Sequence, residues 1–118
     1  EKNDSSGKLI EFPLMTTRFL GKKIPASGGF YLRTLPTKVI KNSFKNYQKE
    51  NIPGSFYIHS WELTPEFMPK LDLPRKDKFV TYHNLNKAYS RMSELLEIFE
   101  FTSFSRYITE NKMDVNLI

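Results

Sequence analysis

Apolar residues recur every three to four positions in two segments of the chain, residues 36–51 and 84–99. This spacing places them on one side of a helix, and in the first segment lysines occupy the opposite side. Pro36 suits a first helical turn because its missing N–H would be unpaired there, and Asn84 suits an N-cap. The apolar positions are Ile40, Phe44 and Tyr47 in the first segment and Leu85, Ala88, Tyr89, Met92, Leu95, Leu96 and Phe99 in the second. The pattern predicts two main amphipathic helices.

Short apolar or alternating runs predict strands at residues 8–14 and 55–59. Gly21 predicts a tight turn at residues 20–23, and prolines predict a long loop over residues 63–81. The remaining predicted elements are an extended piece at residues 30–33, a short strand at residues 100–102 and a final helical turn or two at residues 104–108. Since a helix followed directly by an apolar strand is the unit of α/β folds, we expect an α/β class.

Length and composition indicate one folded domain. The chain has 118 residues, of which 39% are apolar, and this is enough for an ordinary core. Polar ends predict a flexible linker at residues 1–7 and a flexible tail at residues 110–118, with the domain at residues 8–109. The sequence starts without methionine in linker-like sequence, so we expect the other half of the polypeptide to lie upstream.

Several classes of chemistry are excluded by what the sequence lacks. Without cysteine there is no disulfide, no thiolate nucleophile and no cysteine-bound zinc. No apolar stretch reaches the roughly 18 residues of a membrane span, so none is expected. The net charge of +5 favours an anionic partner. However, the lysines of residues 36–51 read as a solvated face without interleaved aromatic rings, so nucleic-acid binding is not expected.

His59 is the candidate catalytic residue. It ends the predicted strand at residues 55–59, and the C-terminal ends of strands are where α/β proteins concentrate their chemistry. An imidazole carries a proton part of the time near neutral pH and can therefore act as a general acid. The alternative is a ring that is satisfied by a backbone carbonyl at the strand end.

The two residues that follow closely after His59 are candidates for substrate binding. Trp61 can form the apolar wall of a sugar or acyl pocket, or can pack in the core. Glu62 can orient His59 or Arg33, or can remain solvated.

A diglycine and a second histidine complete the set of unusual residues. Gly28 and Gly29 leave room for a ligand to approach the backbone, although a diglycine is more often a turn. His83 precedes the second predicted helix, and neither it nor His59 lies in a cluster with metal-ligand spacing. A complete metal site is therefore not expected within this chain.

Several separate segments occur in the order found in one known family. They are Glu11-Phe12-Pro13, Ile24-Pro25, Ser27-Gly28-Gly29-Phe30-Tyr31-Leu32-Arg33, Leu35-Pro36, Phe56-Tyr57-Ile58-His59-Ser60-Trp61-Glu62, and Tyr82 with Asn84-Leu85. In this order the chain resembles the C-terminal region of bacterial and archaeal polysaccharide deacetylases of the exopolysaccharide-biosynthesis type. Those enzymes are similar to family-4 carbohydrate esterases with the NodB-like fold. The resemblance covers most of residues 9–108, and the string around His59 is its specific part.

The resemblance implies the C-terminal part of a deformed (β/α) barrel that removes N-acetyl groups from a polysaccharide with a divalent metal, zinc or a similar ion. The family's metal ligands and aspartate base lie in the N-terminal half, so no metal is expected on this chain alone. His59 would protonate the leaving amine, and Ser60 stands where the family usually has proline. The implied substrate-binding residues are Trp61, Gly28, Gly29, Arg33 and Glu62. The expected partners are a polysaccharide or oligosaccharide substrate and the upstream half of the polypeptide.

Two other interpretations remain open. The chain could be a non-catalytic carbohydrate-binding or protein-docking module in which Tyr31, Tyr57 and Trp61 offer a stacking surface. It could also be a scaffold that closes the barrel, and then His59 would matter for stability alone. A cytoplasmic and a cell-envelope location are equally compatible with the sequence.

Overall fold

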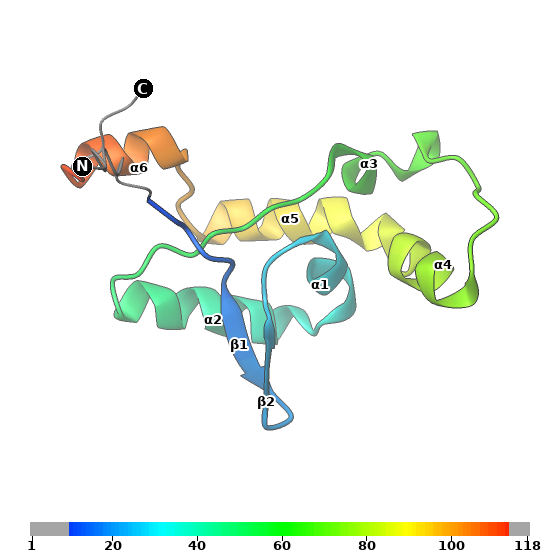
Figure 1. The fold of residues 1–118 in the computed structure, drawn as a ribbon, viewed down its shortest axis with the longest axis horizontal. Helices are drawn as coiled ribbons and strands as arrows, with labels where there is room; N and C mark the ends of the chain where they lie inside the picture. Colours follow the sequence, from blue (N-terminus) through cyan, green and yellow to red (C-terminus); the bar gives the residue numbers. More distant parts are fainter. Residues whose placement is uncertain (1–9, 114–118) are drawn as a thin grey trace, which may run out of the picture.

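The computed structural model describes residues 10–113, which form a small mixed α/β domain dominated by helices (Figure 1). The predicted linker at residues 1–7 and residues 114–118 of the predicted tail lie outside this range. The elements are β1 (Thr16–Phe19), β2 (Lys22–Pro25), α1 (Gly29–Thr34), α2 (Thr37–Lys49), α3 (Ser60–Leu63), the 3-10 turn η1 (Pro65–Phe67), α4 (Arg75–Tyr82), the 3-10 turn η2 (Leu85–Lys87), α5 (Ala88–Ile98) and α6 (Phe104–Glu110).

The sheet of the described residues is a two-stranded antiparallel hairpin of β1 and β2. Thr16 pairs with Pro25 and Phe19 pairs with Lys22, so the connection is a two-residue turn. Its residues, Leu20 and Gly21, both have positive φ values of 50° and 76°, as a type I′ turn requires. The predicted tight turn is therefore confirmed, whereas the two strands that it connects were not predicted.

Both main amphipathic helices are confirmed. The prediction for residues 36–51 corresponds to α2, and the prediction for residues 84–99 corresponds to η2 followed by α5. The predicted cap at Asn84 is wrong in its mechanism, because this residue makes no side-chain cap and adopts a left-handed φ of 51°. Its amide instead donates a hydrogen bond to the Arg33 carbonyl at 3.1 Å.

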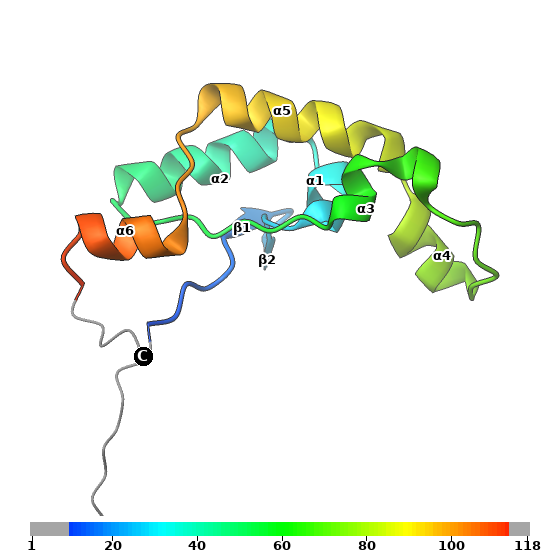
Figure 2. The same ribbon diagram turned by 90° about the horizontal axis from the view of Figure 1, so that it is seen from above.

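The hydrophobic core lies between the hairpin, α1, α2 and α5. In Figure 2, α2 and α5 run beside one another along the same side of the molecule. The Phe44 ring of α2 stacks on Phe99, which follows α5, at a centroid distance of 4.7 Å. The buried cluster consists of Met15, Ala26, Leu32, Leu35, Ile40, Phe44, Leu95 and Phe99.

Three predicted strands do not form regular strands in the described residues. Residues 10–14 and 55–59 are extended but share a single parallel bridge between Leu14 and Ser55, and residues 8–9 of the first prediction lie outside the described range. Residues 100–102 are extended without a strand partner among the described residues. The apolar pattern correctly indicates an extended backbone in these segments. A regular strand also requires an adjacent strand that pairs with its N–H and C=O groups.

Two helices occupy segments for which none was predicted. Residues 30–33 were expected to be extended but belong to α1, where Leu32 and Arg33 are buried. The predicted loop at residues 63–81 contains η1 and α4. No residue of α4 is buried, so this helix has no apolar stripe for periodicity to reveal.

Part of the apolar surface of the described residues is not covered by the rest of the fold. Several large apolar side chains are at least half exposed, including Phe67, Phe79 and Leu96. None of the helices in residues 10–113 combines the length and apolar content needed to cross a bilayer.

Two adjacent leucines of α5 provide a matched test of the core. Leu95 is fully buried, whereas Leu96 is 54% exposed. We expect Leu95→Ala to lower the free energy of unfolding by about 2–5 kcal/mol through lost burial and a cavity. The control Leu96→Ala should change it by less than about 1 kcal/mol. Urea denaturation measures both, and equal effects would contradict the core assignment.

Candidate functional site

His59 stands at the junction between an extended segment and a short helix. Residues 55–58 approach it in extended conformation, and α3 starts directly after it at Ser60. His59 is the N-cap residue of α3, with φ −87° and ψ 145°. Its side chain is 55% exposed, so the imidazole is accessible from solvent rather than enclosed in the core. The alternative was a ring that is satisfied by a backbone carbonyl, but its Nδ1 contacts the Glu62 carboxylate instead.

Glu62 binds both the main chain and the ring of His59. Its Oε2 accepts a hydrogen bond from the His59 backbone N–H at 3.0 Å and lies 3.1 Å from Nδ1. This is a capping-box arrangement, in which the third helical residue reaches back to the N-cap. A carboxylate only accepts hydrogen bonds, so Nδ1 carries a proton. Nε2 is then the ring nitrogen that does not contact this carboxylate.

Arg33 holds the other oxygen of Glu62 in the interior. Its Nε and Nη2 donate to Glu62 Oε1 at 3.2 and 3.0 Å, and both residues are only 1% exposed. The remaining guanidinium hydrogen bonds go to backbone carbonyls of Gly29, Val80, Thr81 and His83. A buried charge pair is stable only when its other polar atoms are also satisfied, and this network meets that condition. Glu62 therefore contacts both residues that it was predicted to orient, Arg33 and His59.

The predicted diglycine lies beside this pair. The side chains of Glu62 and Tyr57 occupy the space where its Cβ atoms would lie. A Cβ on Gly29 would lie 1.9 Å from Glu62 Oε2. Gly28 has φ +101°, and a Cβ there would lie 2.8 Å from the Tyr57 ring. Both glycines are buried. They permit Glu62 and Tyr57 to approach the backbone, while direct contact with a ligand stays a prediction.

Aromatic rings flank His59 on two sides. Trp61 stacks on the imidazole at a centroid distance of 5.6 Å, and Tyr57 meets it edge-on at 5.5 Å. Tyr57 was absent from the main set of predicted site residues. Its spacing could have indicated it, because residues two apart in an extended segment point to the same face. The exposed surface around the imidazole is thus an aromatic one.

The second histidine lies outside this group. His83 stacks on Phe79 at 4.4 Å, and its Nε2 is 3.0 Å from the Asn84 amide. Within residues 10–113 no group of three or more His, Asp or Glu side chains is arranged to hold a metal ion.

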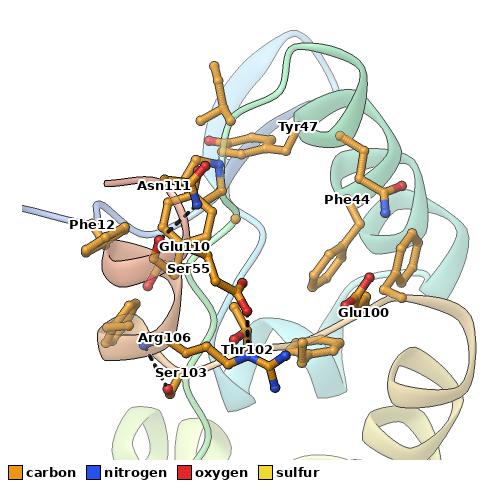
Figure 3. A pocket seen from close by; sticks show the side chains of 18 of the residues that line it. Phe12, Phe44, Tyr47, Ser55, Glu100, Thr102, Ser103, Arg106, Glu110 and Asn111 are labelled. Atoms are coloured by element: carbon orange, nitrogen blue, oxygen red, sulfur yellow. Dashed lines mark hydrogen bonds and ion pairs between the residues drawn. The ribbon is translucent and has the colours of Figure 1, made fainter. Parts of the chain in front are cut away.

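Two cavities of the described part lie elsewhere. A cavity of about 550 Å³ opens between α2, α6 and the segment after α5, lined by aromatic rings and by polar side chains such as Arg106 and Glu110 (Figure 3). A second cavity of about 470 Å³ adjoins residues 10–13. His59, Trp61 and Glu62 line neither of these two cavities.

These features define a small α/β domain that exposes one histidine, oriented by a buried Glu–Arg pair and flanked by two aromatic rings. A family model described as "Domain of unknown function (DUF3473)" matches residues 1–109, and the chain belongs to this family. No curated protein and no solved structure matches the chain. The family description names no activity, so the resemblance to deacetylases stays a prediction that the site can support.

Breaking the buried pair tests how the imidazole is held. Glu62→Gln leaves Arg33 buried without a counter-charge, and we expect the free energy of unfolding to fall by about 3–5 kcal/mol. In the folded fraction, ¹⁵N NMR should show the neutral His59 ring shifting its proton from Nδ1 toward Nε2. The exposed Glu66→Gln is the control and should change neither quantity. An unaltered tautomer in Glu62→Gln would contradict the orienting role.

The position after His59 is suited to proline even though it holds serine. Ser60 is the first helical residue of α3, where proline loses no helical hydrogen bond. The extended backbone of His59 is the conformation that proline demands of the preceding residue. We therefore expect Ser60→Pro to stabilise the fold by about 0.4–1 kcal/mol, with Ser60→Ala as the control in thermal unfolding. A clear loss of stability would show that α3 starts elsewhere.

Proposed function

We propose that this chain is the C-terminal part of a metal-dependent polysaccharide deacetylase and supplies its general acid, His59. The observation that carries the proposal is the exposed imidazole whose Nδ1 is held by Glu62, which leaves Nε2 free to deliver a proton. The ordered segments that resemble such enzymes support the same assignment. The activity, the substrate and the rest of the active site are parts of this proposal.

The proposed chemical role of His59 follows from the needs of amide hydrolysis. Cleaving an N-acetyl group breaks a C–N bond, and the departing amine is a poor leaving group unless it is protonated. A His59 imidazolium would donate the Nε2 proton to that nitrogen, while the Nδ1 proton would stay on the ring and remain hydrogen-bonded to Glu62. Trp61 and Tyr57 would border the sugar next to the reacting amide, because pyranose rings pack well on aromatic faces.

The described residues do not by themselves fit a metal site. The two oxygens of Glu62 already face Arg33 and His59. His59 thus has no second donor beside it that could complete a coordination shell, since three or four ligands are usual. We therefore assign the metal ligands and the base to another stretch of polypeptide and derive no step from the metal.

The backbone of residues 56–58, unpaired within the described part of the chain, supports such a shared architecture. Phe56 and Ile58 pack against the core, while Tyr57 is 46% exposed. Within residues 10–113, the main-chain groups of residues 56–58 have no hydrogen-bond partner. Apolar extended segments are rarely left unpaired, because their free N–H and C=O groups invite another strand. We propose that a further strand pairs here, as in a deformed (β/α) barrel.

A non-catalytic carbohydrate-binding module is the second candidate. The observation in its favour is the arrangement of Tyr57 and Trp61 on either side of the exposed His59 ring. Such a surface can bind a sugar by stacking without any proton transfer.

A histidine exchange in the intact protein separates the two functions. We expect His59→Gln to lower the rate of acetate release from an N-acetylated polysaccharide by about 10²–10⁴-fold, while oligosaccharide affinity changes little. His83→Gln, which alters the other histidine, is the matched control and should retain activity within about twofold. Loss of affinity without an effect on rate would favour the binding module, and full activity in His59→Gln would remove the acid assignment.

A further inference from the structure

The β1–β2 hairpin carries an unusual combination of residues at its tip. Figure 1 shows the hairpin projecting away from the helices. Among the large apolar residues that the structure describes, Leu20 is the most exposed, at 86%. We propose that this tip docks on the surface of a bilayer that contains anionic lipids, with Leu20 entering the interface and the neighbouring cations binding headgroup phosphates.

The backbone of Leu20 makes its exposure difficult to explain by folding alone. Its φ of 50° lies in the left-handed region, which disfavours a branched apolar side chain. Asparagine or glycine would occupy this turn position with less strain. An exposed leucine in a strained position gains free energy only when its side chain leaves water.

The cations beside Leu20 form the second, independent observation. Arg18 and Lys23 are register partners across the hairpin, so two like charges lie side by side on one face. Lys22 adds a third exposed cation next to the turn. No ion pair joins these three residues to an acidic residue of the described part of the chain. An anion between them would relieve the repulsion.

The sequence around the hairpin strengthens this charge pattern. Residues 12–49 contain eight lysines and arginines and no aspartate or glutamate. Two of the eight are neutralised by distant acids, in the pairs Arg33–Glu62 and Lys41–Glu94. Among residues 10–113 no acid pairs with the three hairpin cations, so the hairpin end of this described part is electropositive.

A lipid surface fits these residues better than a soluble polyanion does. Basic residues alone would suit either partner, but an exposed leucine contributes nothing to a highly hydrated polyanion. An apolar tip flanked by cations matches both layers of a bilayer surface, the charged headgroups and the acyl boundary below them. On the inner face of the hairpin, Phe19 and Ile24 pack against the core and fix its direction.

Vesicle co-sedimentation of the intact protein tests the proposal. The probes are vesicles of phosphatidylcholine with about 30% phosphatidylserine, and vesicles of phosphatidylcholine alone. We expect binding to the first and little to the second. The triple variant R18Q/K22Q/K23Q should lose about a hundredfold in partitioning, since each cation contributes about fivefold. The triple variant K38Q/K45Q/K49Q removes the same charge from the exposed face of α2 and should retain most of the binding.

Leu20→Asn is the decisive variant because asparagine tolerates the left-handed turn. We expect at least about a tenfold loss of vesicle binding with an equal or higher melting temperature by circular dichroism. Unchanged vesicle binding in Leu20→Asn would overturn the proposal and indicate a purely electrostatic surface, as would heparin binding that exceeds vesicle binding. A lowered melting temperature would overturn it too, because Leu20 would then be packing against another segment of the protein.

Discussion

The buried ion pair between Arg33 and Glu62 holds together parts of the chain that lie far apart in sequence. Arg33 belongs to α1, Glu62 to α3, and three further guanidinium hydrogen bonds reach carbonyls at the end of α4. Each charge is removed from water and depends on its partner, since a lone buried charge is strongly destabilising. The three helices around the site are therefore linked by polar contacts, in addition to the apolar core that joins α1, α2 and α5.

This pair also connects the interior to the exposed chemistry. Glu62 uses one oxygen for Arg33 and the other for His59, so a fully buried carboxylate orients a ring at the surface. Gly29 is required beside it because any side chain there would occupy the place of the carboxylate. The site is thus a continuous path of contacts from α1 through α3 to the imidazole, with Trp61 and Tyr57 shaping the surface on either side.

The sequence predicts those features that depend on neighbouring residues. The periodic apolar positions of α2 and α5 revealed both helices, and His59, Trp61 and Glu62 stand together because α3 brings consecutive residues into contact. Helix α4 escaped prediction because it buries no residue. The carbonyls that accept hydrogen bonds from Arg33 could not be predicted either, because every residue has a carbonyl and no sequence pattern indicates where it will lie. Extended segments were recognised by composition, but their pairing depends on residues distant in the chain.

One oxygen atom, Glu62 Oε2, serves both the backbone amide and the ring of His59. The main chain and the side chain of this residue therefore share one anchor, and rotation about the bonds between them is restricted. The entropic cost of aligning the imidazole is met when α3 folds rather than when a ligand arrives. Preorganisation of this kind lets a solvent-facing histidine at the N-cap of a four-residue helix keep a defined ring orientation.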